Sequence, residues 1–137
     1  MFDISQLDTL SRAEEGVAMN VIHPRTKEPV KGSDGEAVTI TLLGKNSDTA
    51  RATLRRIGDR ATERAFRGIK STPEDRERDD IEFLVAVTKA WTLSEMDGEA
   101  FPCNPRNAER LWGDARFRWL RDQAIAFVTD EGNYLRD

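Results

Sequence analysis

Apolar and polar residues alternate in two short stretches of the N-terminal third of the chain. Residues 16–23 and 37–43 place every second side chain in an apolar series: Val17, Met19 and Val21, then Val38, Ile40 and Leu42. A period of two predicts β-strands with one apolar face. The residues between them include Pro29 and the Asp34-Gly35 pair, which are typical of loops and tight turns. The pattern therefore predicts an antiparallel β-ribbon over residues 16–43.

After Gly44 the apolar residues recur with a period near 3.6, which predicts helices. Four helices are expected within residues 47–131, over residues 48–66, 73–91, 105–113 and 115–131. Each start carries a capping signal: Ser47 or Asp48, Thr72 before Pro73, Asn104 before Pro105, and Asp114. Two strands alone are only marginally stable in water, so the ribbon needs helices, a third strand or a partner chain to cover it.

The last third of the chain is expected to hold much of the core. Residues 91–137 contain all three Trp, three of the six Phe, the single Cys and the only Tyr. Large aromatic side chains contribute most of the burial available to a small domain. The predicted fold is a single α+β domain, residues 1–137, in which an N-terminal antiparallel β-ribbon is followed by about four helices packed as a small helical domain. Residues 2–13 are expected to form an arm or a turn of helix.

Composition limits the classes of partner. The net charge of -4 argues against a general attraction to nucleic acid or to anionic lipid, although a local basic face can override that average. One Cys cannot form an intramolecular disulfide. The N-terminus does not read as a signal peptide, and no stretch has the roughly 20 apolar residues of a membrane span. We therefore expect a cytoplasmic protein that does not interact with membranes.

No set of residues with catalytic or metal-binding character emerges from the sequence. His23 and Cys103 cannot form a zinc site between them, because structural zinc takes four ligands. One pair of acidic residues, Asp79-Asp80, lies in the charged first turns of a predicted helix. A second group, Glu95, Asp97 and Glu99, lies in a predicted loop. Both settings are typical of solvated carboxylates rather than of acid–base catalysis. We therefore expect no enzyme activity, no cofactor and no metal.

The first predicted helix carries the most distinctive charge pattern. Six arginines stand against two acids in residues 51–67, a local charge of +4, and four are taken as candidate partner-binding residues: Arg51, Arg55, Arg60 and Arg64. Three interpretations remain open, namely phosphate contacts with nucleic acid, an acidic protein partner, or a solvated helix face. No aromatic residue is interleaved on this face to stack on a base, which disfavours nucleic acid.

Trp119 is the fifth candidate partner-binding residue. It lies off the main apolar stripe of the last helix, between Arg118 and Leu120. Exposed Trp residues are common anchors of protein interfaces. The alternative is that the last helix is buried on two sides and that Trp119 belongs to the core.

Two blocks of the chain resemble a known family. They are F-P-C-N-P-R-N-A-E-R-L and F-R-W-L-R-D-Q-A-I-A-F-V-T-D-E-G-N-Y-L, preceded by W-T. The N-terminal order also fits, with a strand ending in His-Pro, a Gly-containing loop, and V-T-I-T-L-L-G before an Arg-rich helix. From about Gly16 onward, the chain resembles the small tail assembly chaperones of long-tailed, siphovirus-like bacteriophages and prophages.

The resemblance implies a role that the residues themselves do not show. Such chaperones act during virion morphogenesis in the host bacterial cytoplasm and are absent from the mature virion. They coat the aggregation-prone tape measure protein and help recruit tail tube protein around it, and some have a longer frameshifted form. The family has no catalytic residues to carry over. Thin Ala-rich helix faces and an incompletely covered ribbon also favour self-association of this chain.

Overall fold

A three-stranded antiparallel sheet lies at the centre of the fold. The computed structural model describes residues 1–136 and places the strands in the order β1 (Val17–Asn20), β2 (Thr39–Leu42), β3 (Thr88–Trp91). Strands β1 and β2 pair from Val17 opposite Leu42 to Asn20 opposite Thr39. The predicted antiparallel ribbon is therefore confirmed, and the apolar face of β2 is fully buried, since Ile40 and Leu42 are 0% exposed.

The third strand corrects the predicted order of elements. The sequence pattern predicted helix to residue 91, but helix α3 (Pro73–Val87) ends at Val87 and β3 follows at once, pairing with β2. The Thr88 hydroxyl donates to the Leu84 carbonyl at 2.6 Å, and the Trp91 ring nitrogen donates to the Phe101 carbonyl at 2.9 Å. Period-3.6 spacing continues through Trp91, so only the open edge of β2 decides that these residues form a strand.

A second, smaller sheet replaces the connection predicted for residues 92–103. Strands β4 (Glu95–Met96) and β5 (Glu99–Ala100) form a hairpin around Asp97 and Gly98. Both turn residues have positive φ, 53° and 81°. That conformation matches the twist of paired strands in two-residue hairpins, and Asp-Gly is one of the sequences that adopt it most readily.

The four predicted helices are present, and short helical turns are added to them. The long elements are α2 (Asp48–Phe66), α3, α4 (Pro105–Gly113) and α5 (Arg118–Thr129). Capping follows the predicted signals at Ser47, Thr72 and Asn104, whereas Asp114 caps a short turn, η2 (Ala115–Phe117), that precedes α5. Three more short elements complete the fold: η1 (Ile4–Leu7), α1 (Leu10–Glu15) and η3 (Glu131–Tyr134).

The core joins the sheet to helices α3, α4 and α5, as the concentration of aromatic residues predicted. Trp112, Phe101 and Tyr134 are almost fully buried. The Tyr134 hydroxyl donates to the Leu42 and Leu43 carbonyls at 3.2 and 3.3 Å, which attaches the C-terminal turn to the end of β2. Burial raises the pKa of Tyr134, so this phenol stays protonated and keeps donating.

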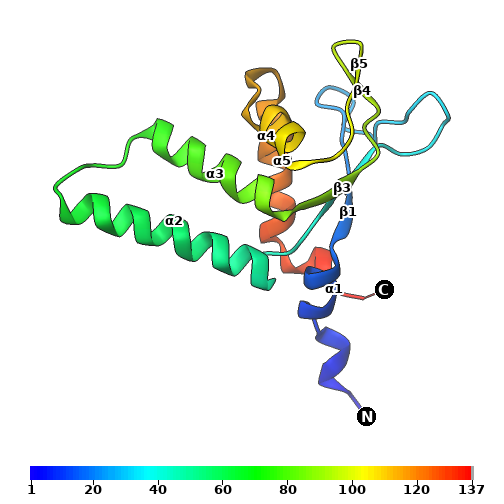
Figure 1. Cartoon of the computed structure of the whole chain (residues 1–137). Helices are drawn as coiled ribbons and strands as arrows, with labels where there is room; N and C mark the ends of the chain where they lie inside the picture. Colours follow the sequence, from blue (N-terminus) through cyan, green and yellow to red (C-terminus); the bar gives the residue numbers. More distant parts are fainter. Residues whose placement is uncertain (137) are drawn as a thin grey trace.

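Two parts of the chain extend away from this core (Figure 1). The hairpin of α2 and α3 projects sideways, and α2 buries only Ala50 and Thr53, both near its start. The N-terminal segment leaves the body at the end opposite hairpin β4–β5. Among the described residues 1–136, no helix combines the length and apolar character needed to cross a bilayer. Both extensions expose side chains to solvent that the core does not cover.

Candidate functional site

Part of the predicted arginine face turns inward and pairs with α3. Arg60 donates to Glu82 at 2.7 Å and lies 3.4 Å from Asp79, and Arg64 lies 4.0 Å from Asp75. The hydrogen bond that Arg60 donates to Glu82 is the main reason that the pKa of Arg60 is raised. Two of the four candidate arginines therefore link the arms of the projecting hairpin. Spacing within one helix cannot reveal such pairs, because their acids lie on another helix.

The other two candidate arginines remain directed outward. Arg51 and Arg55 are exposed and make no ion pair with any residue among positions 1–136. At 3.6 residues per turn they lie beside a ridge of residues spaced four apart. We call this surface the outer face of α2, and it consists of Arg51, Leu54, Arg55, Gly58, Thr62 and Phe66.

Two large apolar side chains on the outer face of α2 are unusually exposed to solvent. Phe66 is 92% exposed and Leu54 is 47% exposed. A methyl group added to Gly58 would meet no atom within 4 Å, so nothing in the chain requires a glycine there. Glycine inside a helix costs about 1 kcal/mol relative to alanine. The ridge has an exposed apolar side chain at each end, small residues between them and two cations beside it, so a partner helix can approach it closely.

A second surface is an apolar groove of about 450 Å³ between the sheet, hairpin β4–β5 and the start of α5. Its floor is the buried core, and its rim includes His23, Pro24 and Glu95. Six half-buried side chains form its walls: Val30, Val38, Leu93, Met96, Phe117 and Trp119. Trp119, predicted as a candidate interface anchor, is half-buried and forms one wall of this apolar groove. Sequence reasoning missed the groove because its walls come from four separate segments.

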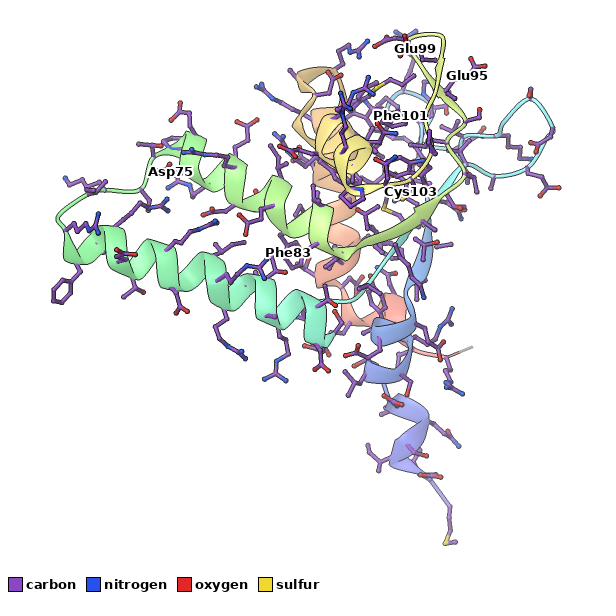
Figure 2. All side chains as sticks on the ribbon, in the orientation of Figure 1. Asp75, Phe83, Glu95, Glu99, Phe101 and Cys103 are labelled. Atoms are coloured by element: carbon purple, nitrogen blue, oxygen red, sulfur yellow. The ribbon has the colours of Figure 1, made fainter. Side chains whose placement is uncertain are left out.

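The acidic residues singled out in the sequence have structural partners or lie apart. Asp97 and Asp114 both bind Arg116, whose guanidinium approaches Asp97 at 2.8 and 3.0 Å. Hydrogen bonds from Arg116 are the main cause that lowers the pKa of each carboxyl. Figure 2 shows Asp75 on the projecting hairpin and Glu95 and Glu99 on hairpin β4–β5, well separated from it.

The single His and the single Cys are also in unreactive settings. His23 Nδ1 accepts from the backbone N–H groups of Arg25 and Thr26 at 3.1 and 3.3 Å, which closes the turn after β1. Burial raises the pKa of the half-buried Cys103 thiol, which keeps it protonated. Within the part of the chain that the structure describes, no group of three His, Cys, Asp or Glu side chains is arranged to hold a metal ion.

A buried ion pair between helices was not predicted. Arg121, on α5, donates to the Trp112 carbonyl and to Glu77 of α3, both at 2.9 Å. Its side chain is almost fully buried, whereas Glu77 is 38% exposed. The pair joins α3, α4 and α5, and it has the character of a structural link rather than of a binding site.

Comparison of the chain with protein-family models, with curated protein sequences and with solved structures gave no match. The outer face of α2 and the apolar groove are therefore the two candidate binding surfaces of this chain.

Proposed function

We propose that this chain is a non-catalytic tail assembly chaperone of a long-tailed bacteriophage or prophage. It binds the tape measure protein, keeps it soluble and helps recruit tail tube subunits. It acts in the host bacterial cytoplasm and is not retained in the mature virion. The sequence resemblance suggests the role, and the observation that carries it is the outer face of α2, an exposed apolar and basic ridge on a projecting hairpin.

The outer face of α2 suits a long helical client. An amphipathic helix presents a continuous apolar stripe, which can contact Leu54 and Phe66 at the two ends of the ridge and pass over the small residues between them. Arg51 and Arg55 add a preference for a client segment that carries acids beside its apolar stripe. The chain as a whole is 34% charged, a composition that keeps a coated complex in solution.

A nucleic-acid-binding or regulatory adaptor protein is the alternative, and the ion pairs of α2 weaken it. Arg56, Arg60 and Arg64 face acids of α3, and Arg67 binds Glu63 at 2.9 Å. Arg51 and Arg55 are then the cations left on the outer face for phosphates. Two such contacts give a log–log salt slope of only about -2, compared with about -10 for a dedicated repressor.

The first test is co-expression with the tape measure protein of the same phage. The wild-type chain should raise the soluble fraction of the client and co-purify with it. The double variant Leu54→Ser/Phe66→Ser should lose most of this effect, because it removes the apolar ridge while changing only exposed side chains. An unchanged client solubility with wild-type chain, and no complex after purification, contradicts the proposal.

A charge-matched pair separates a specific contact from a general loss of positive charge. Arg55→Ser should weaken client binding several-fold, whereas Arg106→Ser, at an exposed position of α4, should leave it unchanged. Equal losses in the two variants count against the outer face of α2 as the client site. A salt slope much steeper than -2 for DNA binding by the wild-type chain would instead support the nucleic-acid alternative.

A further inference from the structure

The N-terminal arm, residues 1–10, exposes much of the apolar surface of this chain. Five of the eight exposed large hydrophobic side chains in the described structure belong to it: Met1, Phe2, Ile4, Leu7 and Leu10. Turn η1 within it buries no residue. Soluble monomers rarely leave such a concentration of apolar surface without a partner.

The arm is nevertheless ordered, by local caps rather than by packing. Asp3 accepts from the Ser5 backbone N–H at 3.0 Å, and Asp8 accepts from the Leu10 N–H at 2.8 Å. Residues three apart eclipse one another in a 3-10 turn, so Ile4 and Leu7, the first and last residues of η1, form one narrow ridge, and Leu10 follows at the start of α1. A segment already held in shape loses less conformational entropy when it docks.

The apolar groove offers a complementary receptor at the other end of the molecule. It is lined almost wholly by apolar side chains, and it opens beside hairpin β4–β5, whereas the arm leaves the body at the opposite end (Figure 1). From this geometry we propose that the arm of one copy inserts its apolar ridge into the groove of a second copy. The proposal does not rest on the tail assembly function.

Charge favours the same pairing. The arm carries Asp3 and Asp8 and no Lys or Arg, whereas the loop beside the groove rim, residues 23–31, carries Arg25, Lys27 and Lys31 against one acid, Glu28. The acids Asp34 and Glu36 lie further along this loop, at its tip beyond the Lys31–Ala37 bridge. Glu95 lines the groove itself, so the attraction is between the acidic arm and the basic loop beside the groove, and it orients the encounter.

The contact is head-to-tail, because arm and groove are different surfaces of one chain. Each copy that donates its arm still has an empty groove, and each copy that fills its groove still has a free arm. Such heterologous contacts produce a closed ring when the rotation closes and an open filament when it does not. The expected assembly therefore grows beyond a dimer as concentration rises.

Sedimentation velocity over a wide concentration range tests the proposal. The wild-type chain should form species larger than a dimer. The arm variant Phe2→Ser/Ile4→Ser should associate about a hundredfold more weakly, since two large apolar side chains no longer become buried. The control Ile69→Ser, at an exposed apolar residue of the connection between α2 and α3, should assemble like the wild type.

A mixing experiment tests the direction of the contact. The groove variant Leu93→Lys keeps its arm, and the arm variant keeps its groove, so each alone should be monomeric and their mixture should stop at a one-to-one dimer. A synthetic peptide of residues 1–12 should dissociate the wild-type assembly, which provides a test even if the groove variant fails to fold. A wild-type chain that stays monomeric, a symmetric dimer that grows no further, or an arm variant that assembles normally would overturn the proposal.

Discussion

At the scale of single residues, two glycines of this chain differ in whether the structure leaves room for a side chain. Gly44 lies where the end of β2 meets α1, and its N–H donates to the Ala13 carbonyl at 3.0 Å. A Cβ built on Gly44 would lie only 2.5 Å from the Ala13 Cβ. Gly58, by contrast, faces open space on α2. The first glycine is required by packing, and the second has no structural requirement inside the chain.

The two alanine variants should therefore change stability in opposite directions. Gly44→Ala should lower the free energy of unfolding by about 1–3 kcal/mol, because the added methyl overpacks a backbone contact. Gly58→Ala should raise it by about 0.5–1 kcal/mol, because alanine is the better helix former. Urea denaturation followed by circular dichroism measures both. Equal effects in the two variants would contradict this distinction between the sites.

At the scale of elements, the junction of α3 and β3 decides the topology. Thr88 ends the helix by donating to Leu84, and its hydroxyl also accepts from the ring N–H of Trp112 at 3.0 Å. Trp112 is fully buried, so no water can replace that acceptor. One hydroxyl group thus joins the last turn of α3, the first residue of β3 and the last turn of α4.

Removal of that hydroxyl should be costly although the side chain keeps its size. Thr88→Val should lower the free energy of unfolding by about 1–3 kcal/mol, the cost of a buried donor left without an acceptor. Thr88→Ser keeps the hydroxyl and should lose distinctly less. Chemical denaturation monitored by tryptophan fluorescence compares them, and a larger loss for the serine variant would contradict the role given to the hydroxyl.

The elements also show which features a periodic pattern can reveal. The capping signals at Thr72 and Asn104 depend on neighbouring residues only, and both helices start where these signals predicted. The end of α3 depends on β2, which lies more than 40 positions away along the chain. The fate of the arginines on α2 depends in the same way on acids of α3.

At the scale of the whole molecule, carboxylates with lowered pKa predict how stability depends on pH. Hydrogen bonds lower the pKa of Asp75, Asp97 and Asp114 below 3.8, the ordinary value. These groups bind fewer protons in the folded chain than in the unfolded chain. Their contribution to stability is therefore fully present above pH 3.8, the pKa of the unfolded groups. It is lost as the pH falls from there through the lower pKa values of the folded chain.

The melting temperature should accordingly fall as the pH drops below about 4. Asp97→Asn should melt below the wild type at neutral pH, because it weakens the contact with Arg116 that holds hairpin β4–β5. The difference should shrink as acidification protonates Asp97 in the wild type. Thermal denaturation at a series of pH values checks this, and a difference that grows in acid would refute the ionic contact.

The pKa of Asp80 is shifted in the opposite direction, so Asp80 serves as an internal comparison. Burial raises its pKa, so the folded chain disfavours its charged form. Its replacement by Asn should be neutral or stabilising at pH 7, where the replacement of Asp97 is destabilising. The two variants together distinguish a carboxylate that pairs with Arg116 from one whose charge is disfavoured by partial burial and by neighbouring acids.

The sequence by itself determined the features that depend on near neighbours. Alternation of apolar residues predicted β1 and β2, periodicity and caps predicted the four long helices, and aromatic content predicted that the last third contributes much of the core. Only the tertiary structure decided the third strand, the inward turn of Arg60 and Arg64, and the position of Trp119 in the apolar groove. The physical reason is sequence separation, because a strand edge, an ion pair and a groove wall each need a partner from a distant part of the chain.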